Sequence, residues 1–127
     1  IARLFRAAAE AETIHALAEL RLAGKVGDTK ANLQAAIGGE TYEYTTMYPD
    51  FQKDAKAEGH DGAYKAFDLA REAEIVHAKL YKDAFENLDK REDVEYYLCP
   101  VCGYVEKGKT PAECPICKAK GASFKKF

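Results

Sequence analysis

Three pairs of acidic or imidazole side chains recur at a spacing of three residues within the first 90 positions. The pairs are Glu12 and His15, Glu40 and Glu43, and Glu74 and His77. On a helix this spacing places both members of a pair on one face, about a turn apart. The apolar pattern predicts core positions there, and a buried carboxylate must be paired, protonated or bound to a cation. One copy would be an ordinary surface Glu beside a His, but the recurrence predicts a polar centre inside a helical core.

The combination matches the ligand pattern of a dinuclear metal site in a four-helix bundle. Such sites take one Glu from each of two helices and a Glu-x-x-His from each of the other two. Carboxylate and imidazole ligands favour iron or manganese over a thiol-seeking metal. Both Glu-x-x-His helices are present here, with only one of the two Glu helices.

One helix with one more glutamate is therefore missing from this pattern. We expect a cleaved, split or incompletely represented protein, which begins abruptly at Ile1. A second fragment or a neighbouring chain would supply the missing helix. Residues 25–39 are a plausible hinge for helix exchange.

Glu43 is a surplus carboxylate in this ligand set. Two ferrous ions carry four positive charges, which four carboxylates balance. Two ferric ions carry six, and an oxo bridge removes only two of them. We therefore hypothesise that Glu43 stabilises the ferric pair and alternates with His15, a neutral ligand that suits the ferrous pair.

All four cysteines lie in the last quarter of the chain as two Cys-x-x-Cys pairs. They are Cys99, Cys102, Cys114 and Cys117. Two such loops place four thiolates around one ion. Clustered pairs predict a metal site in a reducing compartment, here the cytoplasm, and not a disulfide scaffold. The ion is either structural zinc or an electron-carrying iron, and iron is favoured because a redox-active metal pair needs a supply of electrons.

Helical patterns must position the acidic and imidazole pairs. The first helix is expected over residues 1–22, followed by a short helix over 31–37 with Thr29 as its N-cap and a break at Gly38-Gly39. A second long helix should cover 40–58, kinked at Pro49.

A turn at 59–62 and a third long helix over 63–90 complete the helical part. Residues 91–93 then form a charged linker to a small module, which has a strand at 95–98 and too small a core to fold without its metal. The predicted domains are residues 1–92 and 93–127.

The composition excludes several classes of function. Nineteen Lys and Arg residues against 21 Asp and Glu give a net charge of −2, so there is no electrostatic footprint for nucleic acid or an anionic membrane. No apolar run approaches the roughly 20 residues of a membrane span. The start has no signal-peptide pattern.

The order of these motifs resembles the rubrerythrin family over almost all of the chain. The resemblance rests on Glu12-x-x-His15, Glu40-x-x-Glu43, Met47-Tyr48-Pro49, Glu74-x-x-His77, Cys99-Pro-Val-Cys-Gly-Tyr and Cys114-Pro-Ile-Cys. It implies a mostly α protein, in which a ferritin-like four-helix bundle with a di-iron site precedes a rubredoxin-like Fe(Cys)4 domain. Three of the bundle's long helices are in this chain. Two departures are the absent first helix, with its ligand glutamate, and Lys118, where a glycine is usual.

The resemblance also implies residue roles. Glu12 and Glu74 would bridge the irons, Glu40 and His77 would complete one iron, and His15 and Glu43 would be alternative ligands of the other. Tyr48 would donate a hydrogen bond to a ligand carboxylate. His15, Glu43 and Tyr48 are the expected catalytic residues.

The implied activity is the reduction of hydrogen peroxide to water in oxidative-stress defence. Its electrons would come from NAD(P)H through a reductase or rubredoxin and the Fe(Cys)4 site. Family members are dimers or larger, in which the cysteine domain of one subunit lies near the di-iron site of another. Two alternatives are a ferroxidase that handles iron and a zinc-ribbon binding module with a vacant bundle.

Overall fold

The structure is a computed structural model that describes residues 1–90 and 93–127. The described residues pack as two compact units, Ile1–Asn32 and Leu33–Phe127. The mostly α class is confirmed, with three long helical stretches and a small cysteine-bearing module. The predicted linker at Arg91 and Glu92 lies outside the described residues, and the predicted division into 1–92 and 93–127 stays a prediction.

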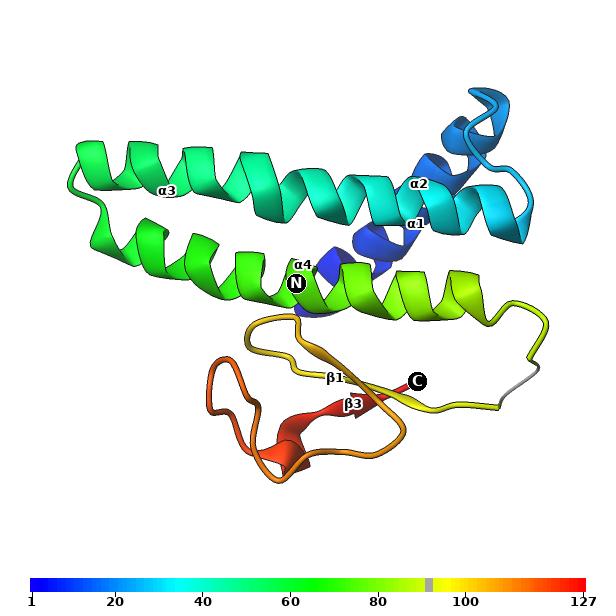
Figure 1. Cartoon of the computed structure of the whole chain (residues 1–127). Helices are drawn as coiled ribbons and strands as arrows, with labels where there is room; N and C mark the ends of the chain where they lie inside the picture. Colours follow the sequence, from blue (N-terminus) through cyan, green and yellow to red (C-terminus); the bar gives the residue numbers. More distant parts are fainter. Residues whose placement is uncertain (91–92) are drawn as a thin grey trace. The chain divides into compact units, whose positions relative to one another are not determined.

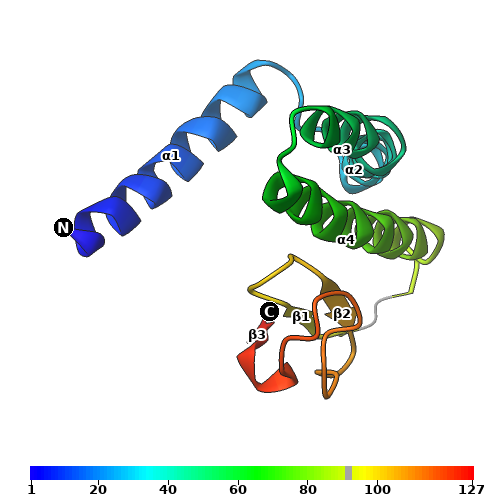
Figure 2. The same ribbon diagram turned by 90° about the vertical axis from the view of Figure 1, so that its left-hand side faces the viewer.

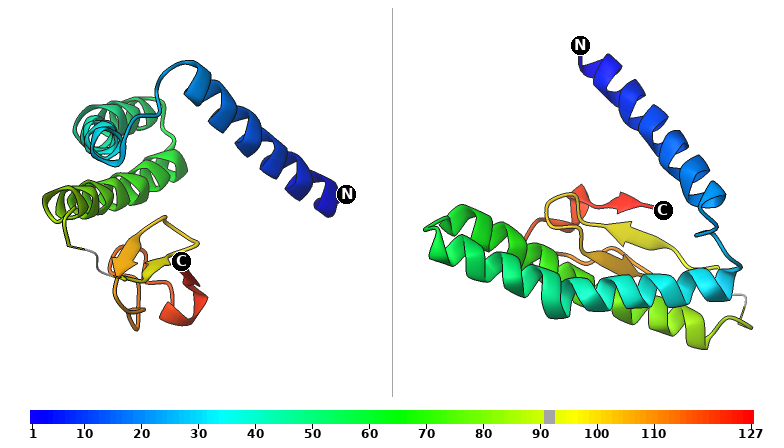
Figure 3. Two further views of the ribbon diagram at one scale, coloured as in Figure 1. Left: turned by 90° about the vertical axis from the view of Figure 1, so that its right-hand side faces the viewer. Right: turned by 90° about the horizontal axis from the view of Figure 1, so that it is seen from above.

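The first unit consists chiefly of α1 (Ala2–Leu22), which matches the predicted first helix (Figure 3). None of its 21 residues is buried. It nevertheless contains large apolar side chains, such as Leu4 and Phe5, which are each 71% exposed. Within the first unit, the helix therefore carries large apolar side chains on its surface.

The next helix is longer than predicted. α2 (Thr29–Tyr42) runs through Gly38 and Gly39 without a break, so the predicted break is wrong. Each glycine lowers helix stability by only about 1 kcal/mol, and the residues on both sides favour helix. The N-cap is Asp28, not Thr29, because the Asp28 carboxylate accepts a hydrogen bond from the Ala31 N–H at 2.8 Å.

The predicted irregularity at Pro49 takes the form of a π-turn. A π-helical segment, η1 (Glu43–Met47), joins α2 to α3 (Tyr48–Ala57). Its wide turn lets the Tyr48 N–H donate to the Glu43 carbonyl, five residues earlier. The helix thereby continues past a proline that has no N–H of its own.

α4 (Asp61–Glu86) returns antiparallel beside this continuous stretch (Figure 1). The rings of Tyr48, Phe51 and Phe67 pack together between α3 and α4, with centroids 5.3–6.3 Å apart. Gln52 is buried, and its side chain donates to Asp68 at 2.9 Å. These contacts hold the two helices in register, which fixes the side chains that project between them.

The cysteine module is a small antiparallel sheet with two loops. β1 (Tyr96–Leu98) lies between β2 (Val105–Lys107) and β3 (Lys125–Lys126). Its core consists of Cys99, Cys114 and the ring of Tyr104. Gly121 is required here, because a Cβ atom at this position would lie 1.8 Å from the Pro111 carbonyl oxygen.

The module lies against α4 of the same chain (Figure 2). Val76 packs on the module's core, and Lys107 forms an ion pair with Asp83 at 2.5 Å. The contact that the resemblance implies between a cysteine domain and the helical site of a different subunit stays a prediction. Over the described residues, no helix combines the length and apolarity that crossing a membrane requires.

Candidate metal centres

The first centre joins the second and third long helical stretches. Glu40 projects from α2, and Glu74 and His77 project from α4 one turn apart. One ligand atom from each of the three lies within 4.8 Å of the others. His77 Nδ1 is 2.7 Å from a Glu74 oxygen and 3.9 Å from a Glu40 oxygen. Helical spacing places Glu74 and His77 on one face of α4, and Glu40 reaches the same point from α2, so the structure brings these three predicted site residues together.

The electrostatics of this cluster disfavour two free carboxylates. Burial, together with a hydrogen bond and charge repulsion from Glu74, raises the pKa of Glu40 to about 8. Glu43 adds further repulsion. The 2.7 Å contact between His77 Nδ1 and Glu74 also requires a proton between two atoms that would otherwise both be acceptors. A bound cation would take the place of these protons, so the donor set suits a positively charged ion.

Glu43 and Tyr48 lie at the two ends of the π-turn. Glu43 is not one of the three clustered ligands, but its charge acts on both Glu40 and Tyr48. Burial and the charges of Glu74, Glu43 and Glu40 raise the pKa of the Tyr48 phenol. Tyr48 therefore keeps its proton at neutral pH and can donate a hydrogen bond toward these carboxylates.

Glu12 and His15 lie on α1, in the first unit. Both side chains are exposed, and His15 Nδ1 is 3.4 Å from a Glu12 oxygen. The predicted pairing within one Glu-x-x-His motif is therefore present in α1. Their membership in the site with Glu40, Glu74 and His77 stays a prediction, as do the metal-ligand roles of all these residues.

The second ring nitrogen of His77 contacts the cysteine module. His77 Nε2 lies 2.9 Å from the carbonyl oxygen of Gly103, which can only accept a hydrogen bond. Nε2 therefore carries a proton, and Nδ1 remains directed toward the carboxylates. Sequence reasoning missed Gly103 in this role, because the contact depends on how the module packs on α4.

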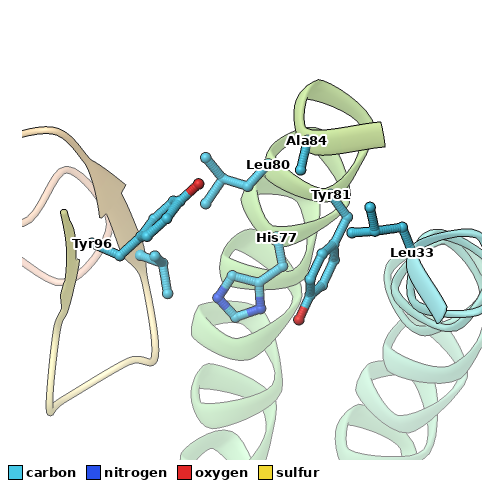
Figure 4. Close-up of a pocket in the computed structure, with 7 residues that line it drawn as sticks. Leu33, His77, Leu80, Tyr81, Ala84 and Tyr96 are labelled. Atoms are coloured by element: carbon cyan, nitrogen blue, oxygen red, sulfur yellow. The ribbon is translucent and has the colours of Figure 1, made fainter. Parts of the chain in front are cut away.

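Tyr81 was also missed as a site residue. It lies one turn after His77, and burial with the charges of Glu40 and Glu74 raises its pKa. Its i+4 spacing from His77 was the available signal. Figure 4 shows Tyr81 and His77 beside a cavity of about 350 Å³. The cavity is lined by Leu33, His77, Leu80, Tyr81, Ala84, Tyr96 and Val105.

The second centre is the set of four cysteines. All four sulfurs lie within 4.8 Å of one another, with Cys99 and Cys117 at 3.5 Å and Cys102 and Cys114 at 3.6 Å. These distances are far beyond a disulfide bond of about 2.05 Å. They are close to the edges of a tetrahedron with metal–sulfur bonds of about 2.3 Å. The geometry therefore fits one tetrahedral thiolate-bound ion.

The environment of the sulfurs favours one thiolate even without an ion. Burial opposes ionisation of Cys99, but hydrogen bonds from the backbone N–H groups of Cys102 and Val101 and from the Cys117 and Cys102 side chains together outweigh it and lower its pKa to about 7. Burial raises the pKa of Cys102, and hydrogen bonds from neighbouring sulfurs add to this effect. Four thiolates together therefore require a bound cation.

The two centres and their order along the chain match one family throughout. The rubrerythrin family model matches residues 1–85, and the model for the rubrerythrin rubredoxin-like domain matches residues 97–125. The chain belongs to the rubrerythrin family. The rubrerythrins carry a di-iron site and a rubredoxin-like iron site with four cysteine ligands. The four cysteines supply the second donor set, and Glu40, Glu74 and His77 supply part of the first.

Individual relatives agree with this assignment. Nigerythrin of Nitratidesulfovibrio vulgaris is 40% identical, over 92% of this chain and 65% of its own length. Rubrerythrin-2 of Clostridium acetobutylicum is 37% identical, over all of this chain and 78% of its own length. A solved structure of nigerythrin in its fully reduced, all-ferrous state superposes with a TM-score of 0.78 and 37% identity, covering 81% of this chain and 51% of that one. The chain thus spans somewhat less than two thirds of nigerythrin.

Proposed function

We propose that this rubrerythrin reduces hydrogen peroxide to water with electrons relayed through the cysteine-bound iron. The observation that carries the proposal is the contact between the two centres, in which His77 faces Glu74 with one ring nitrogen and Gly103 with the other. Gly103 directly follows Cys102, so few bonds separate a thiolate from a carboxylate-cluster ligand. Such a short connection suits delivery of single electrons.

The reaction consumes two protons and two electrons for each peroxide, and it yields two waters. The iron pair, when bound, supplies both electrons. Burial and the charges of Glu74, Glu43 and Glu40 raise the pKa of the Tyr48 phenol. Tyr48 therefore stays protonated at neutral pH and can donate a hydrogen bond or a proton toward the reacting oxygens.

We propose the ligand roles that the family pattern implies. Glu12 and Glu74 would bridge the irons, with Glu40 and His77 completing one of them. Glu43 and His15 would alternate on the other, with Glu43 bound in the ferric state. The position of Glu43 supports this role, because it lies close enough to act electrostatically on Glu40 while remaining outside the three-residue cluster.

We also propose that the protein works as an assembly. On α1, Leu4 is 71% and Ile14 is 67% exposed, and this apolar surface would pack against a second copy or a separate helix. The one further glutamate that the ligand pattern lacks would come from a separate helix, because exchange of identical helices between two copies leaves the number of ligands per site unchanged. The external electron source would be an NAD(P)H-linked reductase or a rubredoxin.

The test replaces the iron of the cysteine site with zinc and leaves the helical iron in place. Zinc carries no electrons, so steady turnover with a reductase and peroxide should fall at least tenfold. A single oxidation of the pre-reduced helical iron should keep its rate. Undiminished turnover with zinc would refute the electron relay. Iron uptake and storage without peroxide consumption would instead indicate a ferroxidase, and a helical site that takes up no iron would indicate a zinc-ribbon binding module.

A further inference from the structure

The π-turn leaves one backbone carbonyl without its usual partner. In an α-helix the Tyr44 carbonyl would accept from the Tyr48 N–H, but that N–H donates to Glu43. In a continued π-helix the donor would be residue 49, which is a proline without an N–H. The backbone thus leaves the Tyr44 carbonyl to find a donor elsewhere.

Arg71 of α4 supplies that donor. Its Nε donates to the Tyr44 carbonyl at 3.0 Å, across the interface between η1 and α4. The Arg71 side chain is half-buried, and the bond is charge-assisted. Two hydroxyls also bond back to carbonyls four residues earlier at the start of this segment, since Thr41 donates to the Ile37 carbonyl and Thr45 to the Thr41 carbonyl, each at 2.6 Å, a pattern that favours a local bend of the helix.

The contact of Arg71 is with the backbone of the turn and not with the carboxylates. The groups that shift the pKa of Glu40 are Glu74 and Glu43, together with burial, and Arg71 is not among them. Tyr44 directly follows Glu43, so the bond fixes the peptide between Tyr44 and Thr45, one residue after Glu43. Arg71 is also one helical turn before Glu74, so a single stretch of α4 carries both a cluster carboxylate and the anchor of the opposite helix.

We propose that Arg71 is a positioning residue, which pins the π-turn through the Tyr44 carbonyl and so places the Glu43 carboxylate beside Glu40. The importance of Glu43 rests on the proposed function, whereas the anchoring of the turn does not. Pro49 has no N–H to donate to the Tyr44 carbonyl, so Arg71 supplies the donor. The effects of substituting these two residues should therefore be non-additive.

The test measures amide hydrogen exchange in residues 43–48 of the iron-loaded full chain, together with iron bound beyond the cysteine site. Arg71→Leu should speed exchange in this segment roughly tenfold and weaken retention of the helical iron by a similar factor. Arg71→Lys keeps the charge but lacks Nε, and it should behave in the same way. Lys65→Leu removes one charge from an exposed position of the same helix and should change neither readout.

Pro49→Ala provides the decisive comparison. This substitution restores an N–H that can donate to the Tyr44 carbonyl, so Arg71→Leu in the Pro49→Ala background should speed exchange less than threefold. Unchanged exchange in Arg71→Leu and Arg71→Lys, or an equally large effect in both backgrounds, would overturn the proposal. If Arg71→Leu speeds exchange but retains the helical iron fully, Arg71 anchors the turn without placing Glu43, and that part of the proposal is overturned. If Arg71→Leu does not fold, Arg71→Lys and its Pro49→Ala double variant decide between the same outcomes.

None of these readouts requires peroxide turnover. A wild-type protein that failed to reduce peroxide would contradict the proposed function while leaving the exchange result intact. Conversely, unchanged hydrogen exchange in the Arg71 variants would refute the anchoring of the π-turn and would leave the proposed peroxide reduction unaffected.

Discussion

Lys118 occupies a left-handed backbone conformation, with φ at 65°, in the loop after the last cysteine. Gly103 has the equivalent place in the first loop, with φ at 82°. The loops are otherwise alike, because the N–H groups of Gly103 and Lys118 donate to Cys99 and Cys114 respectively, each at 3.1 Å. Replacing Lys118 with glycine would therefore remove a strain that only the second loop has.

The size of the effect follows from two opposing contributions. A left-handed conformation costs a non-glycine residue roughly 1–2 kcal/mol. Glycine has greater conformational freedom than lysine in the unfolded chain, which offsets about 0.4–1 kcal/mol of the stabilisation obtained by removing this strain. The exposed Lys118 ammonium contacts only the Pro115 carbonyl at 3.2 Å and Glu113 at 3.8 Å, which contribute little. The net stabilisation by Lys118→Gly should be about 0.5–1 kcal/mol.

Folding of the module is coupled to metal binding, so metal affinity reports this energy. Lys118→Gly should bind Co²⁺ at the cysteines about two- to fivefold more tightly, as measured anaerobically against a competing chelator. Gly103→Ala is the mirror control, because a Cβ there meets no atom within 4 Å and the change is purely conformational. It should bind Co²⁺ about two- to fivefold more weakly. Equal affinities, or a weaker Lys118→Gly variant, would refute this reasoning.

Other positions give independent tests. Glu40 has its pKa raised from 4.5 to about 8, so the folded metal-free chain keeps a proton that the unfolded chain loses. Its stability to denaturant should thus fall as pH rises through this window, and Glu40→Gln should flatten the slope. Gly121→Ala would force a Cβ atom against the Pro111 carbonyl, so it should lower Co²⁺ affinity at the cysteines by more than tenfold in the same competition assay. Glu43→Gln removes the surplus negative charge, so it should slow oxidation of the reduced iron pair at least tenfold in stopped-flow measurements, and an unchanged rate would contradict the alternating-ligand hypothesis.

The sequence predicted the residue groupings that depend on short-range spacing, namely residues one turn apart on a helix and cysteines in one short loop. Glu74 and His77 share a helix face whatever surrounds them, and each Cys-x-x-Cys loop turns two thiolates toward one point. Glu40 lies on another helix, and the ligand pattern of a dinuclear site in a four-helix bundle grouped it with these two residues. The two cysteine pairs and this three-residue cluster could therefore be inferred without coordinates.

What the sequence could not predict depends on contacts between distant segments. Pro49 indicated an irregular helix, but the π-turn is completed by Arg71, which lies 27 residues from Tyr44 along the chain. The bond from His77 to Gly103 spans 26 residues and exists only because the module packs on α4. The break predicted at Gly38 and Gly39 is the opposite error. The prediction gave the helix-breaking preference of glycine more weight than the helix-forming residues on both sides, and α2 runs through both glycines.

The central claim is that the iron pair held between these helices reacts with peroxide. It is tested most directly by mixing the fully reduced, iron-loaded protein anaerobically with hydrogen peroxide and, separately, with oxygen at equal concentration, while following oxidation of both iron sites. We predict that peroxide oxidises the helical iron much faster than oxygen does, with the cysteine-bound iron oxidised next and two electrons consumed for each peroxide. Faster oxidation by oxygen, or cysteine-bound iron that stays reduced while peroxide is consumed, would contradict the account.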